Sequence, residues 1–316
     1  MKIFPFLLFL LLLSGCIKED MDDCKGSISL NFSYTADGST QVFNEYIDKS
    51  VDLYVFDEDR RYISTRRIVG AELQGRHATL DLEPGRYHIV CVGNMGQMDE
   101  VKGLSPGNVA DLTRTLLTHK KETENPDGTL TGEDPLYMGT TDVEVKASDR
   151  LQQTVDFRSL HVNLVVQVKG AARDEAGATP SVPVWTKIGI RFTGLPTETE
   201  LSEGLTGGPL CDYVPPTGQF DPAERLLTTS LDVMRFDRRQ SGLSARQTDD
   251  DIRLVVTNLT TGEPLETIDV MEFVTDNDID LDREEVTIGM LIVISKDGDI
   301  SVEVPDWDIE DVTPGL

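Results

Sequence analysis

Residues that commonly carry catalysis are few in this 316-residue chain and lie far apart. No two of the four histidines, His77, His88, His119 and His161, have a His-x-x-x-His or zinc-ligand spacing. The sequence contains no Gly-x-Ser-x-Gly, P-loop or Gly-x-Gly-x-x-Gly motif. The usual signatures of serine hydrolases and of nucleotide-binding proteins are therefore absent from it. Acidic pairs are uninformative about glycoside hydrolysis, since Asp and Glu together number 56. We expect a protein that is not an enzyme, with no cofactor, no small-molecule substrate and no metal site, and we interpret the histidines as surface or strand residues.

The densest acidic run, Asp276 to Asp282, begins like a calcium loop. An EF-hand loop needs Gly at its sixth position and Glu at its twelfth, where this chain has Leu281 and Thr287. We therefore interpret the run as a solvated loop. Calcium binding is the alternative, because oxygen-rich loops can bind the ion without this motif. Asp249-Asp250-Asp251 is a weaker run of the same kind.

Cys16 is placed for covalent lipidation. Lys2 is followed by an apolar run from Ile3 to Leu13 and then by two small residues just before Cys16, which is the layout of a secretory signal. The run is shorter than the ~20 residues that span a bilayer. Leu13-Ser14-Gly15-Cys16 resembles the lipobox of bacterial lipoproteins, in which the cysteine thiol is diacylated and the preceding peptide is removed. We predict a signal peptide over 1–15 and a lipid anchor at Cys16; an ordinary signal peptide with a chance cysteine is the alternative.

The segment after the anchor is charged and almost free of apolar residues, so 16–26 is expected to be a solvated, lipidated tether. Lys18-Glu19-Asp20 resembles the lysine-plus-acidic tag that some Gram-negative anaerobes use to send lipoproteins to the outer face of the outer membrane. A plain flexible spacer is compatible with the same residues. We expect a lipid-anchored protein of the outer membrane that faces the cell exterior.

The charge of the chain excludes one class of partner. Removing Lys2 with the signal leaves 28 basic and 56 acidic residues, so the mature net charge is 28 − 56 = −28. Nucleic-acid binding is excluded, because proteins hold phosphate backbones with clustered Lys and Arg. An acidic surface is otherwise what a soluble, displayed protein needs.

Three cysteines are left once Cys16 is acylated, namely Cys24, Cys91 and Cys211. Their number is odd and their spacing is not that of a paired metal motif. One disulfide can form in an oxidising compartment, most plausibly between Cys24 and Cys91. The alternative is that Cys91, in a strand-like run, is a small buried apolar residue.

Short runs of alternating apolar residues dominate the pattern and predict strands. Those of the first half include the runs from Ile28 to Tyr34, Val51 to Phe56 and Tyr87 to Val92. Those of the second half are Val162 to Val168, Ile188 to Phe192, Leu254 to Val256, Ile268 to Val270, Val286 to Ile294 and Ile300 to Val304. Lys296-Asp297-Gly298-Asp299 predicts a hairpin turn between the last two.

The remaining pattern adds one helix and a long loop region. Leu104 to Lys121 has a Ser-Pro start and apolar residues at helical spacing, which predicts a helix. Repeated Gly and Pro between Thr193 and Thr248 predict long loops. The fold class is thus all-β, β-rich with one or two short helices. The length predicts two β-sandwich domains, 27–157 and 158–316, each folding without the other.

Several segments together resemble the fimbrillin-associated anchor family, the lipoprotein subunits at the base of type V pili in Gram-negative anaerobes. The resemblance is clearest over the first 170 residues and departs from the family pattern at Cys91-Val92, where an aromatic residue is common. The matching pieces are Cys16-Ile17-Lys18-Glu19-Asp20 with Cys24, Val51 to Asp57, Pro84-Gly85-Arg86-Tyr87 leading to Gly93-Asn94, Tyr137-Met138-Gly139, the run from Leu160 to Gly170, and Trp307.

This resemblance implies two tandem transthyretin-like β-sandwich domains and a role in attaching a pilus and limiting its length, without catalysis. The implied partners are fimbrial stalk subunits, bound by strand complementation, and outer-membrane lipid through acylated Cys16. Some relatives are tip or adhesive subunits, so that role is an alternative. A surface glycan-binding lipoprotein is another, for which only Trp185 and Trp307 could form an aromatic platform.

In the family's assembly mode, a carboxy-terminal strand of one subunit fills a groove in its neighbour. If the strand from Ser27 to Tyr34 stays in place, this protein cannot accept such a strand and would have to donate one. The candidate interface residues are Ile300, Val302, Val304 and Trp307. For Ile300 to Val304 we favour pairing within the protein's own sheet, which makes the tail from Pro305 to Leu316 the better candidate donor.

Overall fold

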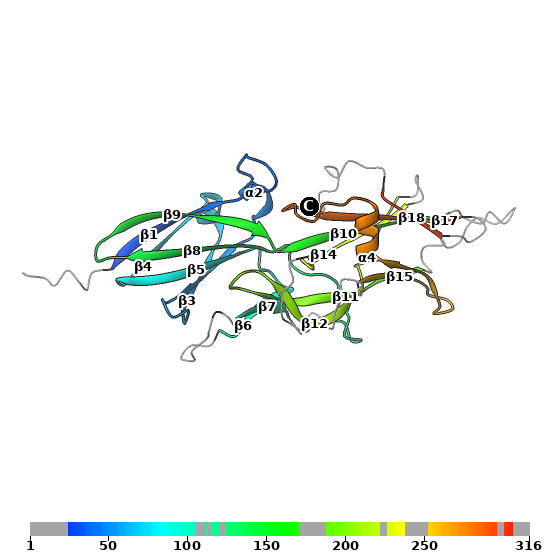
Figure 1. Cartoon of the computed structure of the whole chain (residues 1–316), viewed down its shortest axis with the longest axis horizontal. Coiled ribbons are helices and arrows are strands. Elements are labelled where there is room, and N and C mark those ends of the chain that lie inside the picture. The colour runs from blue at the N-terminus through cyan, green and yellow to red at the C-terminus, as the bar shows by residue number, and fades with distance from the viewer. Residues whose placement is uncertain are drawn as a thin grey trace, which may run out of the picture.

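The computed structural model describes residues 25–104, 112, 115–120, 124–170, 188–221, 226–237, 252–295 and 300–305. Within these ranges the protein is all-β, as the alternating pattern predicts, and it has three sheets and three short helices (Figure 1). No helix in these ranges is long and apolar enough to cross a membrane. The predicted signal peptide and most of the tether lie outside the described residues.

The first half of the chain builds a seven-stranded sheet in the order β3-β2-β5-β8-β9-β1-β4. Neighbours are antiparallel, except that β1 runs parallel to β9. Its strands are β1 (Gly26–Ser33), β2 (Val51–Phe56), β3 (Tyr62–Ile68), β4 (His77–Leu82), β5 (Gly85–Gly93), β8 (Tyr137–Val145) and β9 (Arg150–Ser159).

This sheet folds over on itself around a first core. β8 and β9 pair only between Tyr137–Gly139 and Phe157–Ser159, so the strands on either side of this corner face each other. Alternate residues of β1, such as Ile28 and Leu30, are fully buried there together with residues from β2 and β5. The two-residue period of a strand thus places one apolar face inside, as in a sandwich.

The other face of β2 and β5 is also buried, which explains why every residue of β2 is inaccessible. Tyr54, Phe56 and Val90 on this face pack with Leu117 and Leu201, which come from segments later in the chain. A second core therefore lies between the first sheet and the second half of the molecule.

The second half contributes two further sheets around a third core of 21 buried residues. The five-stranded sheet has the order β13-β14-β10-β17-β18 and consists of β10 (His161–Gly170), β13 (Gln219–Asp221), β14 (Leu226–Met234), β17 (Thr287–Ile294) and β18 (Ile300–Glu303). The six-stranded sheet has the order β16-β15-β11-β7-β6, with β12 also on β11, and consists of β6 (Asp99–Lys102), β7 (Leu116–His119), β11 (Ile188–Glu200), β12 (Thr206–Tyr213), β15 (Arg253–Asn258) and β16 (Pro264–Asp269).

The helices are short: α2 (Phe43–Tyr46), α3 (Gly70–Gln74) and α4 (Val270–Asp276). Asp269 caps α4, since its side chain accepts hydrogen bonds from the backbone N–H groups of Met271 and Glu272. Residues 277–286 after α4 form no helix or strand, so the acidic run is a loop as predicted.

Two local predictions are wrong. The helix predicted from Leu104 to Lys121 is not formed at Leu116–His119, which is strand β7; residues 105–111, 113 and 114 lie outside the described ranges. The region from Thr193 to Thr248 is not mainly loop, because it contains most of β11 and all of β12, β13 and β14. The predicted turn at 296–299 lies outside the described residues, although β17 and β18 do pair as a hairpin would.

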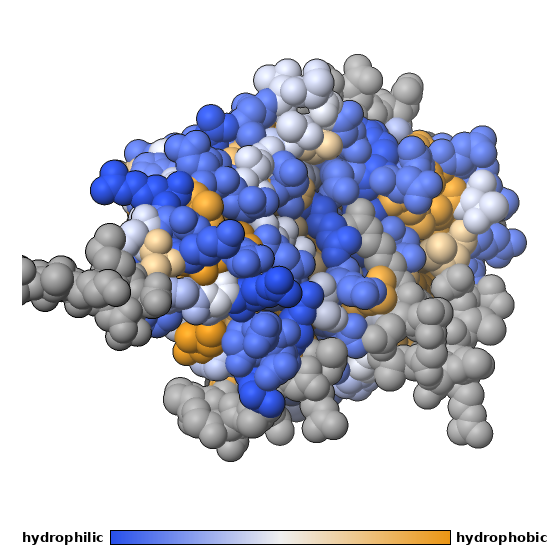
Figure 2. Space-filling view, turned by 60° about the vertical axis from the view of Figure 1, so that its left-hand side comes forward, coloured by the Kyte–Doolittle hydropathy of each residue, from blue (hydrophilic) through white to orange (hydrophobic). Residues whose placement is uncertain are grey.

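The sheets do not divide at residue 157. β6 and β7 come from the first half of the sequence, yet β7 pairs with β11 of the second half, with Thr118 opposite Glu198. Figure 1 shows β6 and β7 beside β11 and β12, below the sheet that contains β10. The face in Figure 2 is largely hydrophilic, with apolar side chains in separate patches, as the negative charge of the chain leads one to expect.

Candidate functional site

Four of the residues singled out from the sequence lie outside the described part of the chain: Cys16, Cys24, Trp185 and Trp307. Cys91 is on β5 and fully buried in the first core, and it has no disulfide partner among the described residues. Burial raises the pKa of the Cys91 thiol well above its ordinary value. The pairing of Cys91 with Cys24 stays a prediction.

The other candidate interface residues lie on or just after β18, an edge strand. β18 pairs antiparallel with β17, placing Ile300 opposite Ile294 and Val302 opposite Ile292. Ile300 and Val302 are partly buried against the third core, whereas Val304 follows the strand and is 45% exposed. Ile300 to Glu303 thus complete the protein's own sheet, which is the arrangement that the sequence favoured.

The amino-terminal strand is an interior strand of its sheet. β1 makes antiparallel pairs with β4 on one side and parallel pairs with β9 on the other. Ile28 and Leu30 are completely buried, and Phe32 is 3% exposed. The groove between β9 and β4 is therefore filled by the chain's own residues, directly after the predicted tether.

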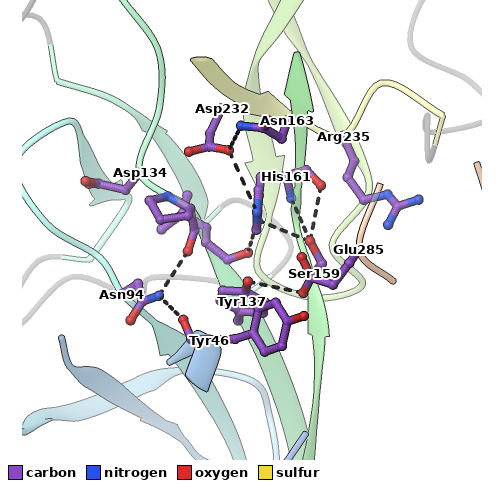
Figure 3. Close-up of polar contacts among 12 residues, drawn as sticks. Tyr46, Asn94, Asp134, Tyr137, Ser159, His161, Asn163, Asp232, Arg235 and Glu285 are labelled. Atoms are coloured by element: carbon purple, nitrogen blue, oxygen red, sulfur yellow. Dashed lines mark hydrogen bonds and ion pairs between the residues drawn. The ribbon is translucent and has the colours of Figure 1, made fainter. Parts of the chain in front are cut away.

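A polar cluster joins the end of β1 to the second half of the molecule; Figure 3 shows the part of it formed by Tyr137 and Glu285. Tyr34 follows β1, and Tyr137 begins β8; both hydroxyl groups donate to the same oxygen of Glu285, at 3.2 Å in the case of Tyr137. Both rings are 2% exposed and contact each other edge to face, with centroids 5.1 Å apart. Glu285 lies in the loop that leads into β17.

The electrostatics of this cluster keep the two phenols protonated. Burial and the Glu285 carboxylate raise the pKa of Tyr34 and of Tyr137 far above the ordinary value of a tyrosine. Each phenol is therefore a fixed donor, and the carboxylate accepts two hydrogen bonds that are stronger than those between neutral groups. The arrangement is suited to holding segments together.

A second set of contacts surrounds His161, where β9 passes into β10 (Figure 3). The His161 Nδ1 atom lies 3.1 Å from the Leu136 carbonyl oxygen and 3.1 Å from the Ser159 hydroxyl. Asp232 on β14 lies on the other side of the ring, 4.0 Å from Nε2, and accepts a hydrogen bond of 2.9 Å from Asn163. These contacts fix the short connection between the two halves.

Arg235 holds the loop that carries Glu285. Its side chain is 1% exposed, and two of its nitrogens donate to the Asp237 carboxylate at 3.0 and 2.9 Å. The remaining nitrogen, Nη1, donates to the carbonyl oxygens of Arg283 and Glu284, and Nη2 also donates to that of Leu281. A buried guanidinium with its donors satisfied in this way gives the loop a defined position.

The same loop also reaches back to the first half. Arg283 pairs with Asp37 at 3.2 Å, and the Glu284 N–H donates to the Asp37 carboxylate at 2.7 Å. The Glu284 side chain accepts from the Ser159 N–H at 2.7 Å. We call Tyr34, Asp37, Tyr137, Ser159, His161, Asp232, Arg235, Glu284 and Glu285 together the junction.

Sequence reasoning did not find the junction. The Tyr34–Glu285 contact joins residues 251 positions apart, and no local pattern reports such a distance. The available signal was weak: Tyr137 and the run that begins at Leu160 were singled out as pieces of a resemblance, without a partner for either. The histidines do lie in strands as expected, but His88, His119 and His161 are buried.

Comparison with known proteins identifies relatives of this fold. The family model of the fimbrillin-A associated anchor proteins Mfa1 and Mfa2 matches residues 21–313. A solved structure of a proposed adhesin from Bacteroides ovatus aligns with a TM-score of 0.67 and 19% identity, covering 92% of this chain and 96% of that chain. No curated protein sequence matches the chain.

Two further solved structures are similar. A proposed adhesin from Bacteroides thetaiotaomicron has a TM-score of 0.64 and 20% identity, covering 89% of this chain and 96% of that one. The fimbrial anchor protein Mfa2 from Porphyromonas gingivalis has a TM-score of 0.60 and 16% identity, covering 88% of this chain and 95% of that one. At these identities the structural matches show a shared fold.

Proposed function

As this chain belongs to the family of fimbrillin-A associated anchor proteins Mfa1 and Mfa2, we propose that it attaches a type V pilus to the outer membrane and ends its growth. In this proposal residues 1–15 are removed, Cys16 is acylated, and 16–26 tether the body on the outer face of the cell. The body is proposed to consist of two transthyretin-like β-sandwich domains, 27–157 and 158–316, with β6 and β7 of the first range completing a sheet of the second. The partners are fimbrial stalk subunits.

The position of β1 is the observation that carries this proposal. An anchor must transmit tension from the membrane into its folded body, and the tether runs directly into β1. Because β1 is paired along both edges and its apolar face is buried, tension on the tether acts on two hydrogen-bonded ladders. A strand held in this way also leaves no open groove for a donor strand between β9 and β4.

The pilus end is then the carboxy-terminal part of the chain. β18 is short and lies at the edge of its sheet, in the part of the molecule distant from the start of β1 (Figure 1). Strand addition uses backbone hydrogen bonds for affinity and alternate side chains for register. In this proposal the tail from Pro305, including Trp307, is donated to a stalk subunit, with Val304 at its base.

Cys16 is tested by replacing it with Ala. We expect Cys16→Ala protein to be released or unprocessed, because acyl chains supply the membrane affinity. The measurement is fractionation of cells followed by a salt wash. Cys16→Ala protein that still sediments with the outer membrane after the wash contradicts lipid anchoring through this residue.

Strand donation is tested by deleting Asp308 to Leu316 and measuring both thermal unfolding of the protein and retention of pili by the cells. Loss of attached pili with an unchanged melting temperature supports donation, and normal attachment contradicts it. Val304→Glu extends the test, since Val304 is exposed and its replacement leaves the core intact. Leu265→Glu is the matched control, because Leu265 is 41% exposed on β16, an edge strand of the other sheet.

A tip or adhesive subunit of the same pilus is the second candidate, favoured by the similarity to two proposed adhesins. Immunogold labelling of intact cells separates the two roles, because an anchor is found at the base of each fibre and a tip subunit at its free end. Label at the free ends contradicts the anchor role.

A further inference from the structure

Three buried side chains that can bind a metal ion meet beside the junction, on segments adjacent to the second half. Asp99 begins β6 and lies directly opposite His119, the last residue of β7. Glu133 comes from the segment that leads into β8. Asp99, His119 and Glu133 are 1%, 5% and 5% exposed, and one ligand atom from each lies within 4.8 Å of the others.

Protein groups satisfy most of the polar atoms in this cluster. Glu133 has one oxygen 2.9 Å from the Nδ1 atom of His119, and its other oxygen accepts from the Tyr213 hydroxyl. The Asp99 Oδ2 atom accepts from the Asp134 N–H at 2.7 Å. The Asp99 Oδ1 atom, in contrast, is buried and has no hydrogen-bond partner among the described residues.

The neighbouring carboxylate, Asp134, does not belong to the cluster. Its Oδ2 atom accepts hydrogen bonds from the backbone N–H groups of Gly96, Met98 and Asp99, at 2.8 to 3.1 Å. Asp134 therefore shapes the loop before β6. Two buried carboxylates are left facing one imidazole.

That set lacks positive charge. A carboxylate in a buried site is costly unless it is paired, bound to a metal ion or neutralised by a proton, and one histidine cannot pair fully with both Asp99 and Glu133. One imidazole nitrogen and two carboxylates are donors that first-row divalent metal ions accept, whereas Ca²⁺ and Mg²⁺ prefer oxygen alone.

We propose that Asp99, His119 and Glu133 bind one divalent transition-metal ion of the Zn²⁺ type. Such an ion holds its ligands at about 2.0–2.2 Å in a tetrahedral arrangement, so two ligand atoms on it are about 3.3–3.6 Å apart. The ligand atoms of Asp99, His119 and Glu133 all lie within 4.8 Å of one another, so the widest pair has to approach by up to about 1.5 Å to reach this geometry. Three protein ligands leave a fourth position to water.

The ion would fasten the first half to the second. Glu133 donates its backbone N–H to the Asp232 carbonyl oxygen on β14 at 2.8 Å, and Tyr213, which holds its side chain, ends β12. β7 itself pairs with β11. A metal at this point ties the β6–β7 hairpin and the segment before β8 to both sheets of the second half.

The test uses the chain from residue 17 onward, with Cys24 and Cys211 replaced by Ser so that their thiols do not compete for zinc. After treatment with a chelator and dialysis, the protein is titrated with Zn²⁺ in excess Mg²⁺, and its melting temperature is followed. We expect a single tight ion per chain and a rise in melting temperature, because a ligand that binds only the native state stabilises it. Co²⁺ in place of Zn²⁺ should give visible absorption bands of a nitrogen- and oxygen-ligated site.

The variants Asp99→Asn and His119→Gln are expected to lose tight binding, the rise in melting temperature and the Co²⁺ bands. His88→Gln is the matched control, because His88 is also buried beside a carboxylate, Asp142 at 2.9 Å, but is not part of this cluster. Its binding should equal that of the parent protein. The proposal is overturned if the parent protein does not bind Zn²⁺ tightly or if Asp99→Asn binds it equally well. It is also overturned if the zinc-treated parent shows the infrared band of a buried protonated carboxyl group. If a variant does not fold, the parent's titration and Co²⁺ spectrum decide.

Discussion

Glu285 stabilises the junction by accepting hydrogen bonds from two buried tyrosines, so its removal should leave both hydroxyl groups without an acceptor. In Glu285→Ala the hydroxyls of Tyr34 and Tyr137 lose their acceptor, and we expect the free energy of unfolding to fall by about 1–3 kcal/mol. Glu285→Gln keeps an acceptor and should lose less. Urea denaturation measures both variants, with Glu272→Ala on the exposed side of α4 as control.

Replacing the tyrosines by Phe separates hydrogen bonding from packing. In the Glu285→Ala background, Tyr34→Phe should recover part of the lost stability, because it removes a buried hydroxyl that has no acceptor. If Tyr34→Phe costs the same free energy in both backgrounds, the two side chains are not coupled in this way.

His88 gives the unfolding equilibrium a dependence on pH. Burial lowers the pKa of His88 below its ordinary value of 6.5, although the Asp142 carboxylate opposes this shift. As pH falls below 6.5, His88 is therefore protonated in the unfolded chain before it is protonated in the folded protein. The free energy of unfolding decreases over this range, until His88 of the folded protein also binds a proton. We expect the free energy of unfolding of His88→Gln to decrease less than that of the parent protein as pH falls.

The measurement is urea denaturation at several pH values on either side of 6.5. His77→Gln is the control, because His77 is exposed on β4. If His88→Gln and the parent protein show the same slope of stability against pH, the burial of a neutral His88 has no such effect.

At the scale of elements, β1 should depend on its buried leucine. Leu30 is completely buried between the two layers of the first sheet, so Leu30→Ala removes methyl groups and leaves a cavity. We expect the free energy of unfolding to fall by about 2–5 kcal/mol. Leu265→Ala, at a half-exposed position on an edge strand, should change it by less than about 0.5 kcal/mol. Equal effects in the two variants would mean that β1 is not held by its apolar face.

The strands that the sequence predicts correctly have one face in a core. β1 alternates between buried and less buried residues, and a two-residue period reports this directly. β10 is buried on both faces except at Asn163 and Lys169, and its run of apolar residues still indicates a strand. β7 was mistaken for helix because Leu112, Leu116 and Leu117 also fit a helical spacing, while the contacts that decide, with β6 and β11, are remote in sequence.

β12 and β13 were hidden by their composition. Gly207, Gly208 and Pro209 are typical of a loop, yet β12 pairs with β11 and accommodates them through register shifts. The junction could not be predicted from the sequence for a different reason. It is formed by loop ends that are brought together only in the complete fold. Pattern reasoning therefore predicts strands well and contacts between sheets poorly.

At the scale of the whole molecule, three kinds of contact join the halves that sequence reasoning separates at residue 157. β7 pairs with β11, Arg283 pairs with Asp37, and Glu285 accepts from Tyr34 and Tyr137. A fragment of 158–316 lacks β6 and β7, so the edge of β11 that pairs with β7 is exposed. Leu201, which is fully buried in the intact protein, also loses the side chains that cover it. The expectation that each half folds alone is untested, and this topology argues for the opposite outcome.

We therefore expect the chain from residue 25 onward to unfold in one cooperative transition, because neither half keeps its full set of strands without the other. The measurements are calorimetry and urea denaturation followed by two probes. Fragments 25–157 and 158–316 should each melt at a lower temperature than the intact chain and should associate when mixed. Limited proteolysis should spare 150–159, since β9 is paired with β1 over 150–156 and with β8 over 157–159. Two separate transitions, or fragments as stable as the whole, would show instead that each half is an independent domain and that the contacts at the junction add little.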